Sequence, residues 1–254
     1  MIVKNEKEKA NLIEAGKRLA RILAIIRNKV APGVTAEELD NLTERLIRDE
    51  GDLPAFLGYT PESANRPYPA SLCVSVNDEI VHGVPNESQK TLKEGDIVGL
   101  DFGLKHEGII VDAAITVPVG QVSEEAKKLI WATGNALTAG IAQAISGNHM
   151  GDISRAIQGE IENAGFTVVE ELGGHGVGDI VHEEPFIPNF GKVGSGELLK
   201  EGMVLALEPI SAAGRSAVVL SPDGYTYRTK DGSLSAHFEH TILIEKDGAR
   251  IITK

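Results

Sequence analysis

The stretch LKEGDIVGLD, residues 92–101, occurs a second time in the chain as LKEGMVLALE, residues 199–208. Both copies start with the same four residues, continue as an apolar run and end on an acid. Asp101 and Glu208 therefore take equivalent positions at the ends of two strand-like segments. This recurrence is the first sign that the chain contains two related halves.

Two further matches occur in the same order. The segment IVHGVP around His82 recurs as IVHEEP around His182, which makes the two histidines equivalent. Residues 31–51 can be laid without gaps on residues 145–165, although few identities survive. The offsets of the strand matches differ, so an insertion or deletion separates them. One match alone has little weight, but three in the same order favour a two-fold pseudo-symmetric fold whose functional groups meet near the axis.

The order of the expected elements also indicates a duplication. Apolar residues at helical spacing, and a capping box formed by Thr35 and Glu38, place the helices. We expect helices over residues 6–29 and 35–50, from 123 onward, and over 150–163. We expect strands over residues 71–76, 96–103, 108–117, 166–172, 203–208 and 235–245. The pattern αα-βββ thus occurs twice and predicts an α+β fold in a single domain, 1–254, with halves of about 1–120 and 121–254.

The composition excludes several classes of function. The chain has 254 residues, enough for a large core, and its net charge of -12 argues against a nucleic-acid surface. Its one cysteine, Cys73, rules out an intramolecular disulfide and is expected to be a small core residue, not a nucleophile. No apolar run has the length of a signal segment or of a membrane span. We therefore expect a cytoplasmic protein that binds neither nucleic acid nor membranes.

Asp101 and Asp112 lie on two strand-like runs joined by residues 105–108, which predict a tight turn. A turn centred on His106 and Glu107 would make the two aspartates direct cross-strand neighbours, with Cβ atoms about 5 Å apart. Like charges so placed destabilise a sheet unless a shared proton or a divalent cation neutralises them. Alternatively, the register differs and both aspartates lie on a solvated face of the sheet.

Two more acids and a histidine favour a cationic centre. Glu208 ends an apolar run, and Glu239 lies inside the strand-like run SAHFEHTILIE. Charged side chains are rarely buried without a partner, so acids in apolar strands indicate a bound cation. His175 lies between glycines in GGHGVG, which let the backbone approach a site closely and expose the imidazole. A single histidine in such a place is more often a turn residue, but here His182 follows shortly after it.

Other catalytic motifs fail on context. Residues 101–103 spell DFG, a magnesium motif of kinases, but neither an HRD loop nor a glycine-rich nucleotide loop accompanies it. The GGHGVG segment lacks the spacing and the lysine of a phosphate-binding loop. The chain also has no G-x-S-x-G and no C-x-x-C motif. Kinase, serine-hydrolase and thiolate-zinc functions are therefore not expected.

The ordered set of acids and histidine resembles the ligand set of the methionine aminopeptidases, which are metallopeptidases with the pita-bread fold. The resemblance covers essentially the whole chain and rests on VNDEIVHGVP, DFG with VDAAIT, GGHGVGDIVHEEPFIPN, GMVLALEP and SLSAHFEHT. The compact form is similar to the type 1 bacterial enzymes. The resemblance implies two pseudo-symmetric αα-βββ halves with a central curved antiparallel sheet and outer helices.

The resemblance also implies two divalent metal ions per chain. Asp112 and Glu239 would bridge them, His175 and Glu208 would complete one site, and Asp101 would bind the other. The residue types agree with this, because an acid-rich set with one imidazole suits Mn, Fe(II) or Co better than a thiolate zinc site does.

The catalytic roles that the resemblance implies concern three residues. Glu208 would be the general base for the water between the metals. His182 would hydrogen-bond the scissile carbonyl, and His82 the amide nitrogen of the following residue. The free α-amine of the substrate would bind at the Asp101 metal, so an aminopeptidase is expected instead of an endopeptidase.

By the same resemblance, a pocket for the methionine side chain is formed by Tyr59, Tyr68, Cys73, Tyr225 and, more loosely, Phe56, because aromatic rings and soft sulfur pack well against a thioether. The segment between Tyr59 and Tyr68 is longer than the usual type 1 loop. Val181 stands where phenylalanine is usual, and Tyr225 where tryptophan is common. The size of the side chain that this pocket accepts is therefore less well defined than the set of metal ligands.

The implied function is removal of the initiator methionine, with the N-termini of nascent polypeptides as partners, transient contact with the ribosome and a monomeric chain. Two alternatives stay open. A proline-directed exopeptidase of this fold usually carries an extra N-terminal domain, whereas this chain begins directly with the catalytic unit. A non-catalytic binding protein of this fold typically lacks metal ligands, and all five are present here.

Overall fold

Helix α2 (Ala36–Asp49) begins where its capping box predicted. In the computed structural model, which describes residues 1–61 and 64–254, the Glu38 N–H donates to the Thr35 hydroxyl over 3.2 Å, and the Thr35 N–H donates to the Glu38 carboxylate over 2.8 Å. The other expected helices are confirmed as α1 (Glu6–Arg27), α3 (Glu124–Gln143) and α4 (Met150–Asn163). Residues 62 and 63, within the segment expected to be longer than usual, lie outside the described residues.

The repeated LKEG segments explain why the two halves fold alike. Each segment anchors the loop that precedes the second helix of its half. Leu92 exchanges backbone hydrogen bonds with residues 33–34, and Leu199 does the same with residues 147–148, all at N–O distances of 2.8 to 3.0 Å. The gapless alignment of these loops also carries both ends of α2 onto both ends of α4. The predicted pseudo-two-fold relation is therefore confirmed.

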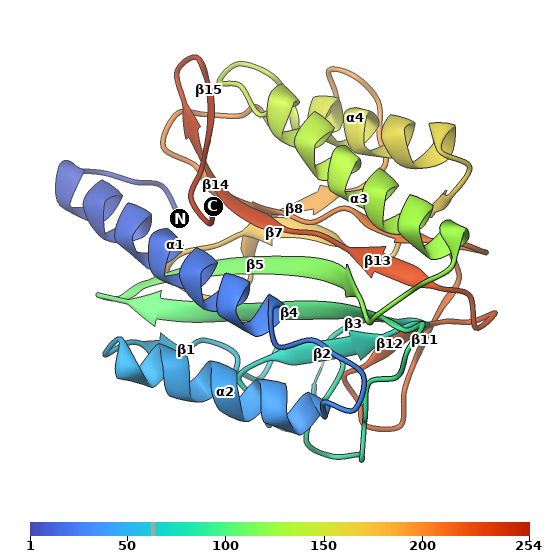
Figure 1. The fold of residues 1–254 in the computed structure, drawn as a ribbon. Helices are drawn as coiled ribbons and strands as arrows, with labels where there is room; N and C mark the ends of the chain where they lie inside the picture. The colour runs from blue at the N-terminus through green and yellow to red at the C-terminus, as the bar shows by residue number, and fades with distance from the viewer. Residues whose placement is uncertain (62–63) are drawn as a thin grey trace.

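The strands of the described residues pair only antiparallel and form four hydrogen-bonded sheets (Figure 1). The first half contains β1 (Leu53–Pro54), β2 (Cys73–Val76), β4 (Ile97–His106) and β5 (Ile109–Pro118). The second half contains, in spatial order, β15 (Gly248–Ile251), β14 (His240–Glu245), β9 (Val204–Leu207), β7 (Gly173–Gly176) and β8 (Glu183–Pro188). Two smaller sheets contain β13 (Ser235–His237), β10 (Ile210–Ala212) and β6 (Thr167–Val168), and β11 (Val218–Leu220), β12 (Tyr227–Thr229) and β3 (Glu79–Val81).

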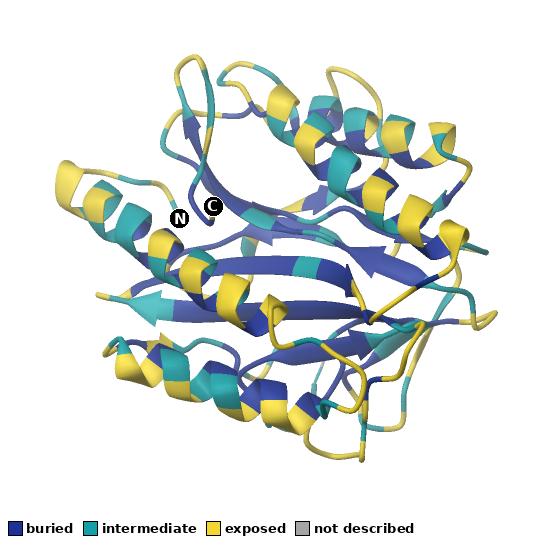
Figure 2. Ribbon diagram, viewed as in Figure 1, coloured by how far each residue is buried: buried dark blue, intermediate teal, exposed yellow. Residues whose placement is uncertain are grey.

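Each half has its own apolar core between helices and strands. Leu12 and Leu19 of α1 belong to the first core, with buried residues of β4 and β5, and Leu129 of α3 and Ile157 of α4 belong to the second. Figure 2 shows buried residues along the strands and exposed ones on the outer faces of the helices. Among the described residues, no helix has the length and apolar character that crossing a bilayer requires.

The β4–β5 hairpin differs from its predicted register. Asp101 pairs with Ala114, and Gly103 pairs with Asp112, so the two aspartates are not direct cross-strand neighbours. The turn residues are Glu107 and Gly108, with φ angles of 47° and 88°. Two consecutive positive φ angles match the right-handed twist of the flanking strands, and Gly108 adopts its angle at little cost. The turn lies one residue later than predicted, which leaves the aspartates as diagonal neighbours on one face of the hairpin.

Asp40 is a buried carboxyl that links α2 to the segment before β2. It accepts backbone hydrogen bonds from Ser71 over 2.8 Å and from Leu72 over 3.0 Å. Burial outweighs these two bonds and raises the pKa of Asp40 from 3.8 to about 6. The folded state therefore binds this proton more tightly than the unfolded state, and Asp40 lowers the stability progressively as the pH rises through this range.

We expect Asp40→Asn to remove this pH dependence, because an amide does not titrate. The free energy of unfolding of the variant, relative to the wild type, should increase as the pH rises from 3.8 to about 6 and stay level above that. Urea unfolding at a series of pH values measures this difference. A difference that stays constant across the whole range would contradict a raised pKa for Asp40.

Candidate metal centre

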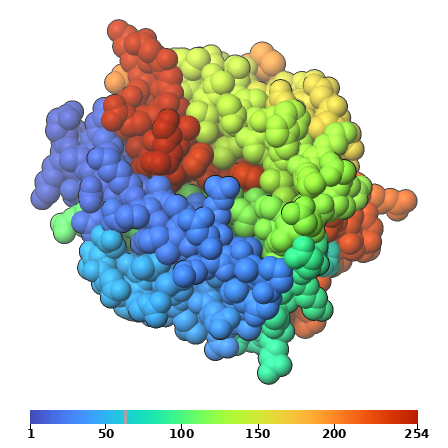
Figure 3. Space-filling view, viewed as in Figure 1, coloured from blue at the N-terminus to red at the C-terminus, as the bar shows by residue number. Residues whose placement is uncertain are grey.

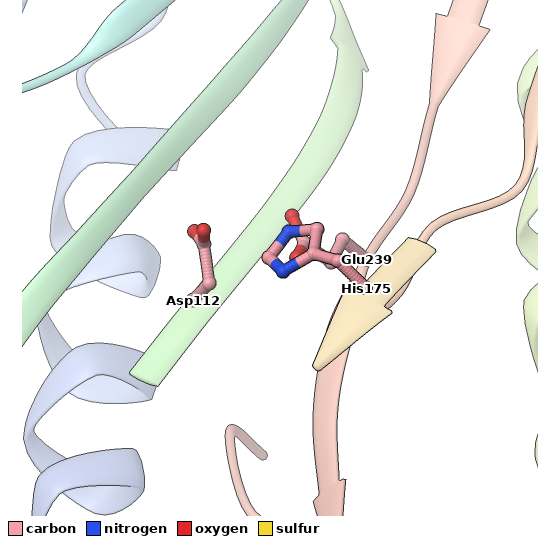
Figure 4. A group of neighbouring side chains, drawn as sticks. All are labelled: Asp112, His175 and Glu239. Atoms are coloured by element: carbon pink, nitrogen blue, oxygen red, sulfur yellow. The ribbon is translucent and has the colours of Figure 1, made fainter. Parts of the chain in front are cut away.

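Three buried side chains from different segments of the chain converge where the two halves meet. Asp112 comes from β5, His175 from β7 and Glu239 from the segment directly before β14. One ligand atom of each lies within 4.8 Å of the others. Figure 4 shows Asp112 on one side of the group and His175 with Glu239 on the other. The three residues form a compact donor set of two carboxylates and one imidazole.

Asp101 and Glu208 lie beside this group. Asp101 shares one face of the β4–β5 hairpin with Asp112 and interacts with its carboxyl group. Glu208 directly follows β9, and its Oε1 lies 3.5 Å from Nε2 of His175. The fold therefore brings together all five residues that the sequence analysis expected to hold metal.

His237 belongs to the same cluster, although the sequence analysis did not single it out. Its Nε2 lies 3.3 Å from Oε2 of Glu208 and 3.9 Å from Oε2 of Glu239. Burial lowers the pKa of His237 to about 3, so the imidazole is neutral at neutral pH and adds no positive charge. A signal was present in the sequence, because residues two apart on a strand face the same side and His237 precedes Glu239 by two.

The four carboxylates of the cluster cannot all ionise without a compensating charge. Burial, together with the neighbouring Glu208, raises the pKa of Asp112 to about 8. Burial raises the pKa of Glu208 well above its usual value, and burial with the neighbouring acids does the same for Asp101 and Glu239. The described residues that line the site include no lysine or arginine. Without a bound cation these carboxyl groups keep their protons, and a cation taken up from solvent would supply the charge that lets them ionise.

Unpartnered polar atoms mark where a cation would bind. The atoms Asp101 Oδ1, Asp112 Oδ1, Glu239 Oε1 and His237 Nε2 are buried without a hydrogen-bond partner, a situation that is rare in folded proteins. Nδ1 of His175 lies 2.9 Å from the Gly176 carbonyl oxygen, and donation there leaves the Nε2 lone pair available. Burial lowers the pKa of His175 to about 3, which keeps this lone pair unprotonated. The donor set of carboxylates and imidazole fits a metal ion.

The glycines around His175 allow its strand to fit between two neighbours. A Cβ at Gly174 would lie 2.3 Å from the Ala206 carbonyl oxygen on β9, and one at Gly176 would lie 2.3 Å from the Glu184 carbonyl oxygen on β8. His175 itself is only 7% exposed. The expectation that these glycines expose the imidazole was therefore wrong: they permit close packing of β7, which fixes the position of His175.

A cavity of about 1050 Å³ opens beside the carboxylate cluster. His82 and His182 line it, with ring centroids 6.5 Å apart, and His182 meets the His175 ring edge to face at 4.5 Å. The Tyr59 hydroxyl lies 3.0 Å from Nδ1 of His182. Burial lowers the pKa of His182, and burial together with His182 lowers the pKa of His82 to about 3. Both imidazoles are therefore neutral at neutral pH.

The side chains expected around methionine line the same cavity, namely Phe56, Tyr59, Tyr68, Cys73, Val181 and Tyr225. The rings of Tyr68 and Tyr225 meet edge to face at 5.0 Å, and the Tyr68 hydroxyl donates to the Gly83 carbonyl over 3.1 Å. Cys73 is the cross-strand neighbour of Asp101, so this wall joins the carboxylate cluster directly. Burial and Asp101 raise the pKa of the Cys73 thiol, which stays protonated and serves as a soft apolar surface.

Arg66 links the segment between Tyr59 and Tyr68 to residues 223–225. Its guanidinium donates to the Asp223 carbonyl oxygen over 2.8 and 3.2 Å and forms an ion pair with Glu87. The Tyr225 hydroxyl donates to the Arg66 carbonyl oxygen. Thr60, Pro61 and Ala64 of this segment line the cavity. Its described part is therefore built into the pocket wall.

Comparisons with known proteins agree with this geometry. The model of metallopeptidase family M24 matches residues 10–246. The methionine aminopeptidase of Aquifex aeolicus (strain VF5) is 44% identical over 252 residues, which cover 98% of this chain and 97% of the relative. Methionine aminopeptidase 1 of Bacillus subtilis (strain 168) is 42% identical over 254 residues, which cover 100% of this chain and 99% of the relative.

Solved structures confirm the expected pita-bread fold. The crystal structure of methionine aminopeptidase from Thermotoga maritima matches with a TM-score of 0.94 and 42% identity, and each chain is covered completely. The prolidase from Pyrococcus horikoshii OT3 matches with a TM-score of 0.76 at 23% identity, and 63% of its chain is covered. The second likeness shows the fold alone.

We expect Gly174→Ala to weaken Mn²⁺ binding by the metal-free protein, because the added methyl group would push β7 from β9 and displace His175. Gly159→Ala in α4 is the matched control. No atom lies within 4 Å of a Cβ at that position, and the substitution should stabilise the helix by about 0.5–1 kcal/mol. Calorimetric titration compares the two variants, and equal Mn²⁺ affinities would contradict the role given to Gly174.

Proposed function

The chain belongs to metallopeptidase family M24, as its motifs indicated, and we propose that it removes the N-terminal methionine from newly made polypeptides by metal-assisted hydrolysis of the first peptide bond. One observation carries this proposal. A carboxylate and imidazole cluster with unpartnered atoms borders a cavity whose walls suit a thioether side chain. The high identity to methionine aminopeptidases over the full chain supports it.

Two divalent ions per chain are part of this proposal. Asp101, Asp112, His175, Glu208 and Glu239 would hold them. The chemistry that such ions supply is a water of lowered pKa and a positive charge beside the attacked carbonyl. The carboxylate-rich donor set supports Mn, Fe(II) or Co as the metal.

Glu208 is the proposed general base. Its Oε1 and Oε2 lie 3.5 and 3.3 Å from the imidazole nitrogens of His175 and His237, so the carboxylate stands between the two rings. Burial raises the pKa of Glu208, so its carboxylate accepts a proton more readily than an exposed one. The proton would stay on Glu208 until the leaving amine takes it up.

His182 and His82 are the proposed contacts to the scissile bond. If the Tyr59 hydroxyl donates to Nδ1 of His182, Nε2 carries the proton and can donate to the carbonyl oxygen of the substrate. Tyr59 thus selects the tautomer that catalysis needs. His82, 6.5 Å away between ring centroids, would contact the following residue of the substrate.

The position of the pocket supports an aminopeptidase. Cys73 in the pocket wall pairs with Asp101 across the sheet, so a side chain bound in the pocket brings the substrate α-amine close to the Asp101 end of the cluster. A substrate residue that begins its chain, and therefore has a free α-amine, fits this arrangement. We further propose that the chain acts as one catalytic domain and as a monomer, on nascent chains in the cytoplasm and in transient contact with the ribosome.

A cleavage assay on Met-Ala-Ser, Leu-Ala-Ser and Ala-Pro peptides, with and without chelator, tests the proposed function. We expect cleavage of the methionine peptide alone, and its loss when metal is removed. Preferred cleavage of the Ala-Pro peptide would favour the proline-directed alternative, and cleavage that survives chelation would contradict the metal mechanism. Failure to cleave any peptide in the presence of Mn²⁺ or Co²⁺ would favour a binding protein.

Tyr59→Phe should lower kcat for the methionine peptide while the bound metal stays at the wild-type amount, because the ring is kept and the bond to Nδ1 of His182 is lost. His82→Ala should likewise slow catalysis without loss of metal. Metal analysis and steady-state kinetics on the same samples measure both effects. Loss of metal from His82→Ala would contradict the assignment of His82 to the substrate.

A further inference from the structure

The contact between the two halves at the carboxylate cluster depends on few backbone hydrogen bonds. Glu239 donates its N–H to the Ala114 carbonyl over 2.9 Å, and Ala114 donates to the Glu239 carbonyl over 3.4 Å. On either side of this pair, side-chain hydroxyl groups take over the connection between β5 and residues 237–241.

Thr241 forms one of these connections. Its hydroxyl accepts from the Asp112 N–H over 2.9 Å and donates to the Asp112 carbonyl over 2.8 Å. Thr116 forms the other, because its hydroxyl accepts from the His237 N–H over 2.9 Å and donates to the His237 carbonyl over 2.8 Å. Each half thus holds the backbone of one cluster residue of the other half through a single hydroxyl group.

The two threonines are related by the internal symmetry. One shift along the sequence carries Asp112 onto His237, Ala114 onto Glu239 and Thr116 onto Thr241. The reciprocal bonds of Ala114 and Glu239 place this pair at the axis, with one threonine on each side. The two symmetry-related threonines therefore form the same pair of backbone hydrogen bonds.

Burial explains why a hydroxyl group is needed at these positions. Thr116 and Thr241 are 2% and 0% exposed, and Asp112 is 3% exposed. A hydroxyl both donates and accepts from one atom, so it satisfies an N–H and a C=O at once. Valine has nearly the same shape but would leave both backbone groups buried without partners, which is costly.

We propose that Thr241 and Thr116 are positioning residues for the metal centre. They set the distance between the strand that carries Asp112 and the segment that carries His237 and Glu239, and with it the width of the cluster. This inference rests on the proposed function in one respect, namely that the cluster binds divalent cations. Each hydroxyl group bonds to backbone atoms and acts through the backbone of the residue that it holds.

Calorimetric titration of the metal-free protein with Mn²⁺ tests the proposal on wild type, Thr241→Val and Thr241→Ser. Thr241→Val should weaken Mn²⁺ binding about 10- to 100-fold, as is typical for residues that orient metal ligands. Thr241→Ser keeps the hydroxyl and should retain nearly the wild-type affinity. Thr116→Val should show a loss similar to that of Thr241→Val.

Thr43→Val controls for the general effect of removing a buried hydroxyl. Thr43 is 0% exposed and donates only within α2, to the Leu39 carbonyl over 2.7 Å. We expect a lower melting temperature and an unchanged Mn²⁺ affinity. If Thr43→Val loses as much Mn²⁺ affinity as Thr241→Val, a general loss of stability explains both losses. That result would overturn the proposal.

Two other outcomes would also overturn it: wild-type affinity in folded Thr241→Val, or an affinity loss in Thr241→Ser equal to that in the valine variant. If Thr241→Val does not fold, Thr241→Ser and Thr241→Ala replace it, since they differ by the hydroxyl alone; equal affinities would then refute the inference. A wild-type protein that binds no Mn²⁺ would instead refute the proposed function.

Discussion

Four carboxyl groups buried side by side, with no lysine or arginine among the described residues around them, are the constraint on which the rest of this structure depends. Taking a single carboxylate out of water costs several kcal/mol, and each neighbouring acid adds to that cost. A divalent cation removes the penalty and satisfies the orphaned oxygen atoms. The strands must therefore bring these groups together in one geometry, and the fold is the means of holding them there.

The duplicated framework provides this geometry without duplicating the chemistry. The first half contributes Asp101 and Asp112, and the second contributes His175, Glu208 and Glu239, so neither half contains the complete set. Symmetry-related positions carry different groups. A glutamate stands opposite Asp101, and a neutral imidazole, that of His237, stands opposite Asp112. The symmetric backbone fixes the distances, while the side chains create an asymmetric site with a cavity on one side.

Local signals predicted much of this. The capping box at Thr35, the apolar spacing of the helices and the repeated LKEG segments depend on residues close in sequence, and the structure bears them out. The hairpin register failed because Glu107, a residue that rarely adopts a positive φ, occupies the first turn position. His237 was missed although its spacing from Glu239 was informative. The threonine hydroxyl bridges join residues more than a hundred positions apart, so no local pattern could indicate them. The walls of the side-chain pocket were inferred from a family resemblance, since they too come from distant segments.

We propose that the cluster at the junction of the halves is a two-metal centre. Anomalous diffraction from crystals grown with Mn²⁺ tests it most directly, because it locates the metal without reference to activity. We expect two anomalous peaks among Asp101, Asp112, His175, Glu208 and Glu239. A single peak would contradict the binding of two ions, and the absence of any peak in this cluster would contradict a metal centre altogether.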